Sequence, residues 1–262
     1  MFQNKTSKFM KEKKIVGIIP ARYKSTRFEG KPLADICGKP MIWWVYRQFT
    51  LAKGIDEVYV ATDDERIADA CNRYGMKYIM TSDQHPTHLD RLAEVANKID
   101  ADFYININGD EPLMMPEYIE CLIPGSKIDP SGFYVANAMT MIKKPVEVND
   151  VSRIKVVTDN FGNAMYLART PIPYPKASSA FEYMKFVGIQ CFTKSALIFC
   201  EKTPRGRIEG IEDIDEYRFL ENGKKIRFVE VPAETLSVDT KTDLLVVRNV
   251  IERRIKNGEI IL

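Results

Sequence analysis

Short apolar strands alternate with amphipathic helices along the first 107 residues, and this alternation restricts the fold more than any other feature. Strand-like runs lie at 14–20, 57–61, 77–80 and 103–107, and helical patterns lie between them at 40–50, 64–74 and 90–99. Strands and helices that alternate at this spacing form crossover units, whose strands run parallel in one sheet. The sequence therefore predicts an α/β fold with its active site at the carboxyl ends of the strands.

The second half of the chain predicts more strands and a smaller β-rich lobe at about 134–192. Candidate strands lie at 134–141, 154–158, 164–167, 185–192 and 226–230, and candidate helices at 209–222 and 240–256. The segment 158–163 has the composition of a hairpin turn. The proline-rich run 170–175 excludes a helix or a central strand and predicts a surface loop. We expect one domain over residues 14–262, preceded by a loose extension at 1–13.

Charge, hydropathy and cysteine content exclude several classes of protein. Thirty-eight Lys and Arg residues against 36 Asp and Glu give a formal net charge of +2, which excludes a globally basic nucleic-acid footprint. No run approaches 18 apolar residues, so neither a transmembrane helix nor a signal peptide is expected. The five cysteines are odd in number and lack a CxxC spacing. They indicate reduced thiols in a cytoplasmic protein rather than a disulfide framework or a zinc site.

A basic loop follows the first predicted strand. Arg22, Lys24, Arg27 and Lys31 lie within ten residues of one another. A basic loop at this edge of a parallel sheet suits a polyphosphate, because cations and backbone N–H groups offset the charge that grows during phosphoryl transfer. A solvated basic turn is the alternative, and no Walker motif is present.

Acidic residues follow apolar segments at two distant places in the chain. Asp110 and Glu111 come after the strand at 103–107 and a glycine, and Asp239 precedes the last predicted helix. Paired carboxylates beside a basic loop suit a magnesium–phosphate site, and Asp110 is the better ligand candidate. An acidic turn and a plain helix N-cap are the alternatives for Asp110 and Asp239, so neither signal is specific alone.

Seven ordered segments join these separate signals into one pattern. They are IIPARYKSTRFEGKPLADICGKPM, VATDDERIADAC, DRLAEVA, NGDEP, ARTPIPY, FLENG and SVDTKTDL. From about Lys14 to about Val250 the chain resembles the CMP-Kdo synthetases, the 3-deoxy-manno-octulosonate cytidylyltransferases. The resemblance implies a Rossmann-like nucleotidyltransferase fold, with helices on both faces of a mostly parallel sheet, and a homodimer. It also implies transfer of CMP from CTP to an acidic sugar, with Mg²⁺ and release of pyrophosphate.

The resemblance assigns roles to individual positions of this chain. The expected nucleotide contacts are Ala21, Arg22, Ser25, Thr26, Lys31, Ala61, Thr62, Asp63 and Arg91. Asp110 and Asp239 would hold Mg²⁺, with Asp110 between the α-phosphate and the attacking hydroxyl. The expected catalytic residues are therefore Arg22, Lys31, Asp110 and Asp239, and in-line attack on the α-phosphorus needs no covalent enzyme intermediate.

The acceptor positions depart from the family pattern. Asn108 stands where the family has Gln, Phe186 for His, Gln190 for Tyr, Asp215-Glu216 for Glu-Gln, and Thr87-His88-Leu89 for Ser-Gly-Thr. We expect the acceptor to contact His88, Asn108, Phe186, Gln190, Glu209 and Glu216. The changes predict an intact donor reaction, a rebuilt acceptor pocket and poor use of Kdo itself. If Glu216 faces the pocket, an amine-bearing acid is favoured. An exposed helix position for Glu216 and a loop cap for His88 are the alternatives.

Three functions stay open from the residues. The leading one is a cytidylyltransferase that acts on an acidic sugar of the Kdo type or a relative. The second is the same transfer to another acid, such as an amino-sugar acid, a phosphonate or a phosphorylated metabolite. The third, a non-catalytic binding protein on the same scaffold, is disfavoured because such a protein has no need for paired metal carboxylates. None of the three involves nucleic acid or membrane insertion.

Overall fold

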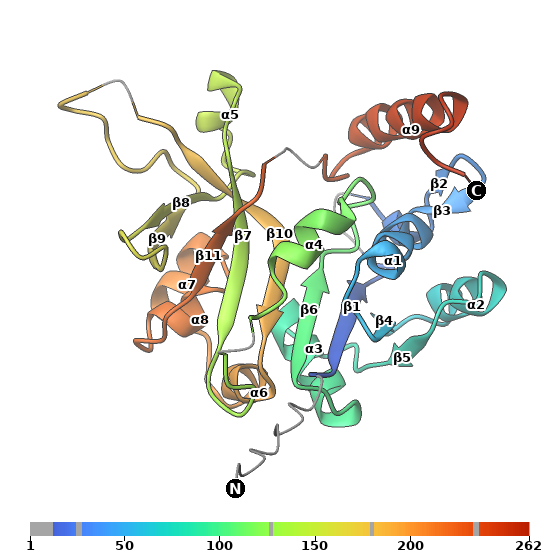
Figure 1. The fold of residues 1–262 in the computed structure, drawn as a ribbon, viewed down its shortest axis with the longest axis horizontal. Helices are drawn as coiled ribbons and strands as arrows, with labels where there is room; N and C mark the ends of the chain where they lie inside the picture. The colour runs from blue at the N-terminus through green and yellow to red at the C-terminus, as the bar shows by residue number, and fades with distance from the viewer. Residues whose placement is uncertain (1–12, 25–27, 126–127, 179–180, 233–235, 262) are drawn as a thin grey trace, which may run out of the picture.

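A large mixed sheet forms the centre of the molecule (Figure 1). The computed structural model describes residues 13–24, 28–125, 128–178, 181–232 and 236–261. Within these residues the main sheet has nine strands. Seven of them follow the order β11-β7-β10-β6-β1-β4-β5, and β8 and β9 extend from β10.

The first half of the chain forms the parallel part of this sheet. Its strands are β1 (Ile15–Ala21), β4 (Glu57–Thr62), β5 (Tyr78–Met80) and β6 (Phe103–Ile107). The crossover helices are α1 (Met41–Leu51), α2 (Glu65–Arg73) and α3 (His88–Lys98). Between β1 and α1 lie a short 3₁₀ turn, η1 (Lys31–Leu33), and the small pair β2 (Asp35–Ile36) and β3 (Lys39–Pro40). β1 pairs in parallel with both β4 and β6, which confirms the predicted parallel sheet.

The second half adds strands of mixed direction. They are β7 (Val135–Met141), β8 (Lys155–Thr158), β9 (Ala164–Ala168), β10 (Met184–Phe192) and β11 (Arg227–Glu230). β10 runs antiparallel to both β6 and β7 and so joins the two halves. In the β8–β9 turn, Asp159 Oδ1 accepts hydrogen bonds from the backbone N–H groups of Phe161 and Asn163, and Gly162 has a φ of +76°. The predicted hairpin is therefore confirmed.

Helices cover both faces of the sheet. α1, α2 and α4 (Pro116–Cys121) bury apolar residues such as Phe49 and Ile119 on one face. α3, α6 (Lys194–Lys202) and α8 (Tyr217–Leu220) bury Leu92, Leu197 and Phe219 on the other. The closing helix α9 (Lys241–Lys256) packs beside α1 and the β2–β3 pair (Figure 1). Among the described residues, no helix combines the length and the apolar composition needed to cross a membrane.

One predicted helix was wrong. Residues 209–222 do not form a single helix, because Asp213 takes a left-handed conformation with a φ of +52°. The chain breaks there into α7 (Arg207–Glu212) and α8, and this break turns the side chains of residues 213–216 toward the sheet edge. The short helix α5 (Pro145–Val148) and helices α4 and α6 had no counterpart in the prediction. The predicted extension at 1–13 lies outside the described residues except for its last position.

Candidate active site

The carboxyl ends of three parallel strands meet at one edge of the sheet. Arg22 follows β1, Asp63 follows β4 and Asn108 follows β6. A cavity of about 480 Å³ opens at this edge, and we call it the first cavity. Its lining residues include Ala21, Arg22, Lys24, Lys31, His88, Arg91, Asn108, Gly109 and Asp110. A cavity therefore lies at the strand ends, where the sequence predicts the active site.

The loop after β6 comes unusually close to β1. A Cβ atom placed on Gly109 would lie 2.9 Å from the carbonyl oxygen of Pro20, so only glycine allows this approach. The approach brings the next residue, Asp110, to the basic loop after β1. The backbone N–H of Val238 donates a 2.8 Å hydrogen bond to the Asp110 carbonyl, which fixes Asp239 beside the same loop.

Lys31 contacts both predicted metal carboxylates. Its Nζ lies 2.7 Å from Asp110 Oδ2 and 3.9 Å from Asp239 Oδ1. The three side chains come from distant parts of the sequence and are all partly buried. Two carboxylates from separate segments therefore converge on one cation, as the sequence predicts.

Two arginines form the opposite wall of the first cavity. Arg91 is fully buried, donates to Asp63 Oδ2 at 2.5 Å and also bonds Thr81. Arg22 Nη2 donates to the carbonyl oxygen of His85 at 2.5 Å. Burial and the nearby charge of Arg91 lower the pKa of Arg22. Desolvated cations of this kind bind phosphate oxygens strongly.

The remaining predicted nucleotide residues divide into three groups. Ala21 lines the first cavity, whereas Ala61 and Thr62 are fully buried in β4 and do not line it. Thr62 instead supports the loop, because its Oγ1 accepts from the backbone N–H of Asp64 at 3.3 Å. Ser25 and Thr26 lie outside the described residues.

A second cavity of about 410 Å³ adjoins the first. The two share Arg22, His88 and Asn108 at their border. The second is lined further by Thr87, Phe186, Arg205, Asp213, Asp215 and Glu216, among others. Most positions at which the sequence departs from the family pattern therefore face this one space.

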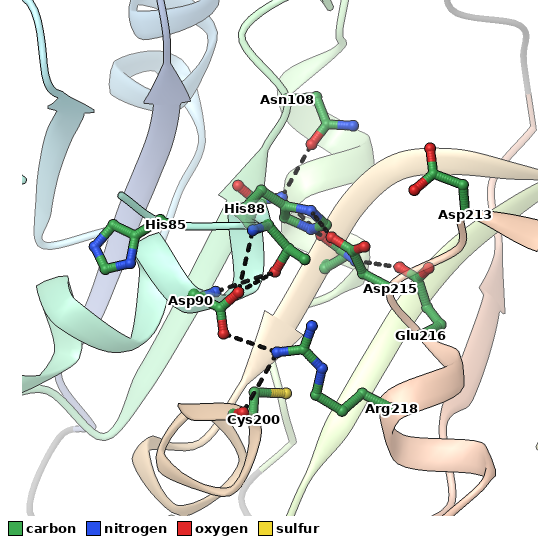
Figure 2. A network of polar contacts seen from close by, with 12 residues as sticks. His85, His88, Asp90, Asn108, Cys200, Asp213, Asp215, Glu216 and Arg218 are labelled. Carbon is green, nitrogen blue, oxygen red and sulfur yellow. Dashed lines mark hydrogen bonds and ion pairs between the residues drawn. The ribbon is translucent and has the colours of Figure 1, made fainter. Parts of the chain in front are cut away.

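His88 is the first residue of α3 (Figure 2) and lines both cavities. Its Nδ1 donates to Asp215 Oδ2 at 2.7 Å, and its Nε2 lies 3.0 Å from Gln190 Oε1. Burial opposes the charge on the imidazole, but the hydrogen bond and the charge of Asp215 outweigh it and raise the pKa of His88 to about 9. His88 is therefore an imidazolium at neutral pH, and both of its nitrogens donate.

Glu216 lines the second cavity and is only 3% exposed. Its Oε1 accepts a hydrogen bond from Gln190 Nε2 and a second, of 3.2 Å, from Asn137 Nδ2. Figure 2 shows the side chain turned toward the strands rather than toward solvent. The alternative of an exposed helix position for Glu216 is therefore excluded.

The prediction that Glu209 contacts the acceptor is not supported. Its side chain is fully buried and does not line the second cavity. Arg218 donates hydrogen bonds to both carboxylate oxygens of Glu209, from Nη2 to Oε1 at 2.5 Å and from Nε to Oε2 at 3.1 Å. Arg218 also donates to Asp90, which closes the capping box of α3 with Thr87. Glu209 thus supports the helix that carries His88.

Sequence reasoning missed three buried polar residues near the second cavity. Asn106 and Asn137 lie within β6 and β7, and Arg218 lies in α8. A signal for the two asparagines was present, since each interrupts an otherwise apolar strand, in FYINI and in VANAM. Buried amides in such positions bond other buried polar groups.

Comparisons with known proteins agree with this geometry. The family model described as Cytidylyltransferase matches residues 16–226. The 3-deoxy-manno-octulosonate cytidylyltransferase of Escherichia coli is 41% identical over 90% of this chain and 95% of its own length. The 8-amino-3,8-dideoxy-manno-octulosonate cytidylyltransferase of Shewanella halifaxensis is 40% identical over 87% of this chain and 94% of its own. A solved CMP:2-keto-3-deoxy-manno-octonic acid synthetase in complex with CTP superimposes with a TM-score of 0.86, at 40% identity, over 92% of this chain and 99% of the other.

Proposed function

Since this chain belongs to the cytidylyltransferase family, we propose that it transfers CMP from CTP to an acidic sugar of the Kdo type and releases pyrophosphate. The observation that carries this proposal is the meeting of Lys31, Asp110 and Asp239 at the edge of the first cavity. A binding protein has no use for two carboxylates held against one cation beside a basic wall. The second cavity adjoins this site, which supports a place for the acceptor there.

Asp110 and Asp239 are the residues that would hold Mg²⁺. The fit rests on the position of the Lys31 ammonium, which both carboxylates approach and which marks a place that favours positive charge. Two carboxylates leave coordination positions for phosphate oxygens, which is the usual way that proteins bind this ion. When bound, Mg²⁺ offsets the charge of the triphosphate and lowers the pKa of a hydroxyl group beside it.

Cationic side chains of the protein also neutralise the negative charge of the triphosphate. Arg22 and Lys31 bind the triphosphate and stabilise the negative charge that grows on the leaving pyrophosphate. The acceptor hydroxyl loses its proton and attacks the α-phosphorus in line, while the bond from that phosphorus to the bridging oxygen breaks. Arg91 holds Asp63 in place at the end of β4, next to the cavity that we propose takes the nucleotide.

The test is pyrophosphate release with CTP and a panel of acids. We expect release with acidic sugars of the Kdo type. Release only with a phosphonate or a phosphorylated metabolite would move the function to the second alternative. Binding of CTP without release under any acid of the panel would favour a non-catalytic protein.

We propose a homodimer as the working form of the enzyme. Large apolar side chains of the β8–β9 lobe face solvent: Val151 is 62% exposed, Phe161 76% and Met165 64%. Tyr174, in the segment that projects after β9 (Figure 1), is 85% exposed. Apolar groups gathered on one lobe are typical of a covered surface. Sedimentation equilibrium of the wild type and of Met165→Glu tests this, because the variant should shift the mass toward that of a monomer.

The cysteines support a reducing compartment, and we place the enzyme in the cytoplasm. All five are free thiols. Burial raises the pKa of Cys71 to about 12, so this thiol stays protonated and inert.

A further inference from the structure

Glu216 is a buried carboxylate whose hydrogen-bond donors are neutral amides. Gln190 and Asn137 both donate to its Oε1. Burial raises the pKa of Glu216, which is the direction expected when a carboxylate lies in a protein interior without a bonded cation. A carboxylate in this position is costly in the free protein, and a cationic ligand removes that cost.

The amides around Glu216 form a row across three strands. Gln190 of β10 lies opposite Asn106 of β6 on one side and opposite Asn137 of β7 on the other. Asn106 Nδ2 donates to Gln190 Oε1 at 2.7 Å, so the Gln190 amide is fixed with its nitrogen toward Glu216. The Oδ1 atoms of Asn106 and Asn137 are buried and have no hydrogen-bond donor among the described residues. The amide donors of this row are therefore already used, and its unsatisfied polar atoms are acceptors.

The neighbouring charges do not neutralise Glu216. His88, the cation that faces it, is bonded to Asp215, and Arg205 is bonded to Glu209 and Asp213. Burial opposes ionisation of Asp215, yet the hydrogen bond and charge of His88 lower its pKa, so the two form an internal ion pair.

The second cavity is lined by charges of both signs, including Arg22 and Glu216. Arg22 lies at the border with the first cavity, where it donates a hydrogen bond to the carbonyl oxygen of His85. Glu216 lines the second cavity but not the first. The reacting hydroxyl must lie near the border, because the α-phosphate that it attacks is bound in the first cavity. A sugar acid of the Kdo type carries its carboxylate on the carbon that bears this hydroxyl, so its acid group lies toward Arg22.

We propose that the acceptor is a zwitterionic sugar acid, whose carboxylate faces Arg22 and whose protonated primary amine binds Glu216. This inference rests on the proposed CMP transfer and specifies its substrate class. The amine supplies a charged donor to Glu216, whose side-chain donors in the protein are neutral amides, and a charge-assisted bond to a desolvated carboxylate is among the strongest that a site can form. Glu216 is then a residue that determines specificity.

The experiment compares Kdo with 8-amino-3,8-dideoxy-manno-octulosonate, in which a primary amine replaces one hydroxyl. For CMP transfer by the wild type, we expect kcat/KM for the 8-amino acid to be at least tenfold above kcat/KM for Kdo. In Glu216→Gln, a change that keeps the shape but removes the charge, the ratio of the two constants should fall to about one. Glu230→Gln is the matched control, since Glu230 is exposed at the end of β11 and lines neither cavity, and it should keep the wild-type ratio.

A binding measurement separates this inference from the proposed function. Calorimetric titration of the two acids into the protein with CTP and Ca²⁺ reports affinity without requiring turnover. Tighter binding of the amine-bearing acid, with that preference lost in Glu216→Gln, supports the inference even if no pyrophosphate is released. The absence of pyrophosphate release would refute the proposed function instead. Equal affinity for the two acids, or a preference for Kdo by the wild type, overturns the inference and leaves CMP transfer standing.

Discussion

Replacing Arg218 by methionine should destabilise the protein far more than a typical substitution. Arg218 is 2% exposed, and it holds both oxygens of Glu209, which is fully buried. Removing one partner of such a pair leaves a buried, uncompensated charge and costs about 3–5 kcal/mol. Arg205 Nε also lies 3.2 Å from Glu209 Oε1, so we expect the lower end, about 3 kcal/mol.

Urea unfolding followed by circular dichroism measures this effect. With a slope of about 3 kcal/mol per molar urea for a chain of this size, the midpoint should fall by about 1 M. The double variant Arg218→Met/Glu209→Met should recover most of the loss, because an apolar pair of similar volume needs no charge partner. Arg205→Met is the control, and it should cost less than about 1 kcal/mol, since its side chain is 39% exposed.

Two results would refute this reasoning. One is a loss below about 1 kcal/mol in the single variant, which would show that the buried Glu209 side chain does not depend on its pairing with Arg218. The other is a double variant that is less stable than either single variant, which would show that packing rather than charge pairing makes the site.

Further predictions concern the donor site and the pH dependence of stability. Asp110→Asn and Asp239→Asn should each lower turnover by orders of magnitude with the fold retained by circular dichroism, and a near-normal rate would reject their metal role. CTP should be strongly preferred over ATP and GTP in pyrophosphate release, and comparable turnover of ATP would contradict the base site. The raised pKa of His88 stabilises the fold by at most about 3 kcal/mol below pH 6.5, and this contribution is lost as the pH rises through about 9. Urea midpoints of wild type and His88→Gln should therefore converge between pH 6.5 and 9.5, and a constant difference would refute the ion pair with Asp215.

The sequence predicted the parts of the fold that depend on local pattern. The strand at 103–107 has the bounds that the mainly apolar run FYINI predicts. The hairpin at 158–163 follows from the turn chemistry of Asp159 and Gly162. Strand ends in a parallel sheet share an edge, and this general rule was enough to bring Asp110 toward the basic loop that holds Lys31.

The sequence could not predict features that depend on register or on a single backbone angle. Gln190 lies opposite both Asn106 and Asn137 because the pairing of β10 with β7 shifts between Val187 and Gln190. No pattern in either strand indicates this irregularity. In the sequence, Asp213 is indistinguishable from any other residue of a charged helix. Its left-handed backbone conformation nevertheless breaks the helix and turns the Glu216 side chain toward the sheet.

The insertion of β10 between β6 and β7 also determines when β6 gains its second neighbouring strand during synthesis on the ribosome. β6 is buried at every position in the finished sheet. Its partner β10 emerges only after residues 108–183 have been synthesised, and until then β6 is an unprotected apolar edge. Pairing over such a distance along the chain is slow. We expect nascent chains paused within residues 108–183 to be the form most prone to aggregate and most dependent on chaperones.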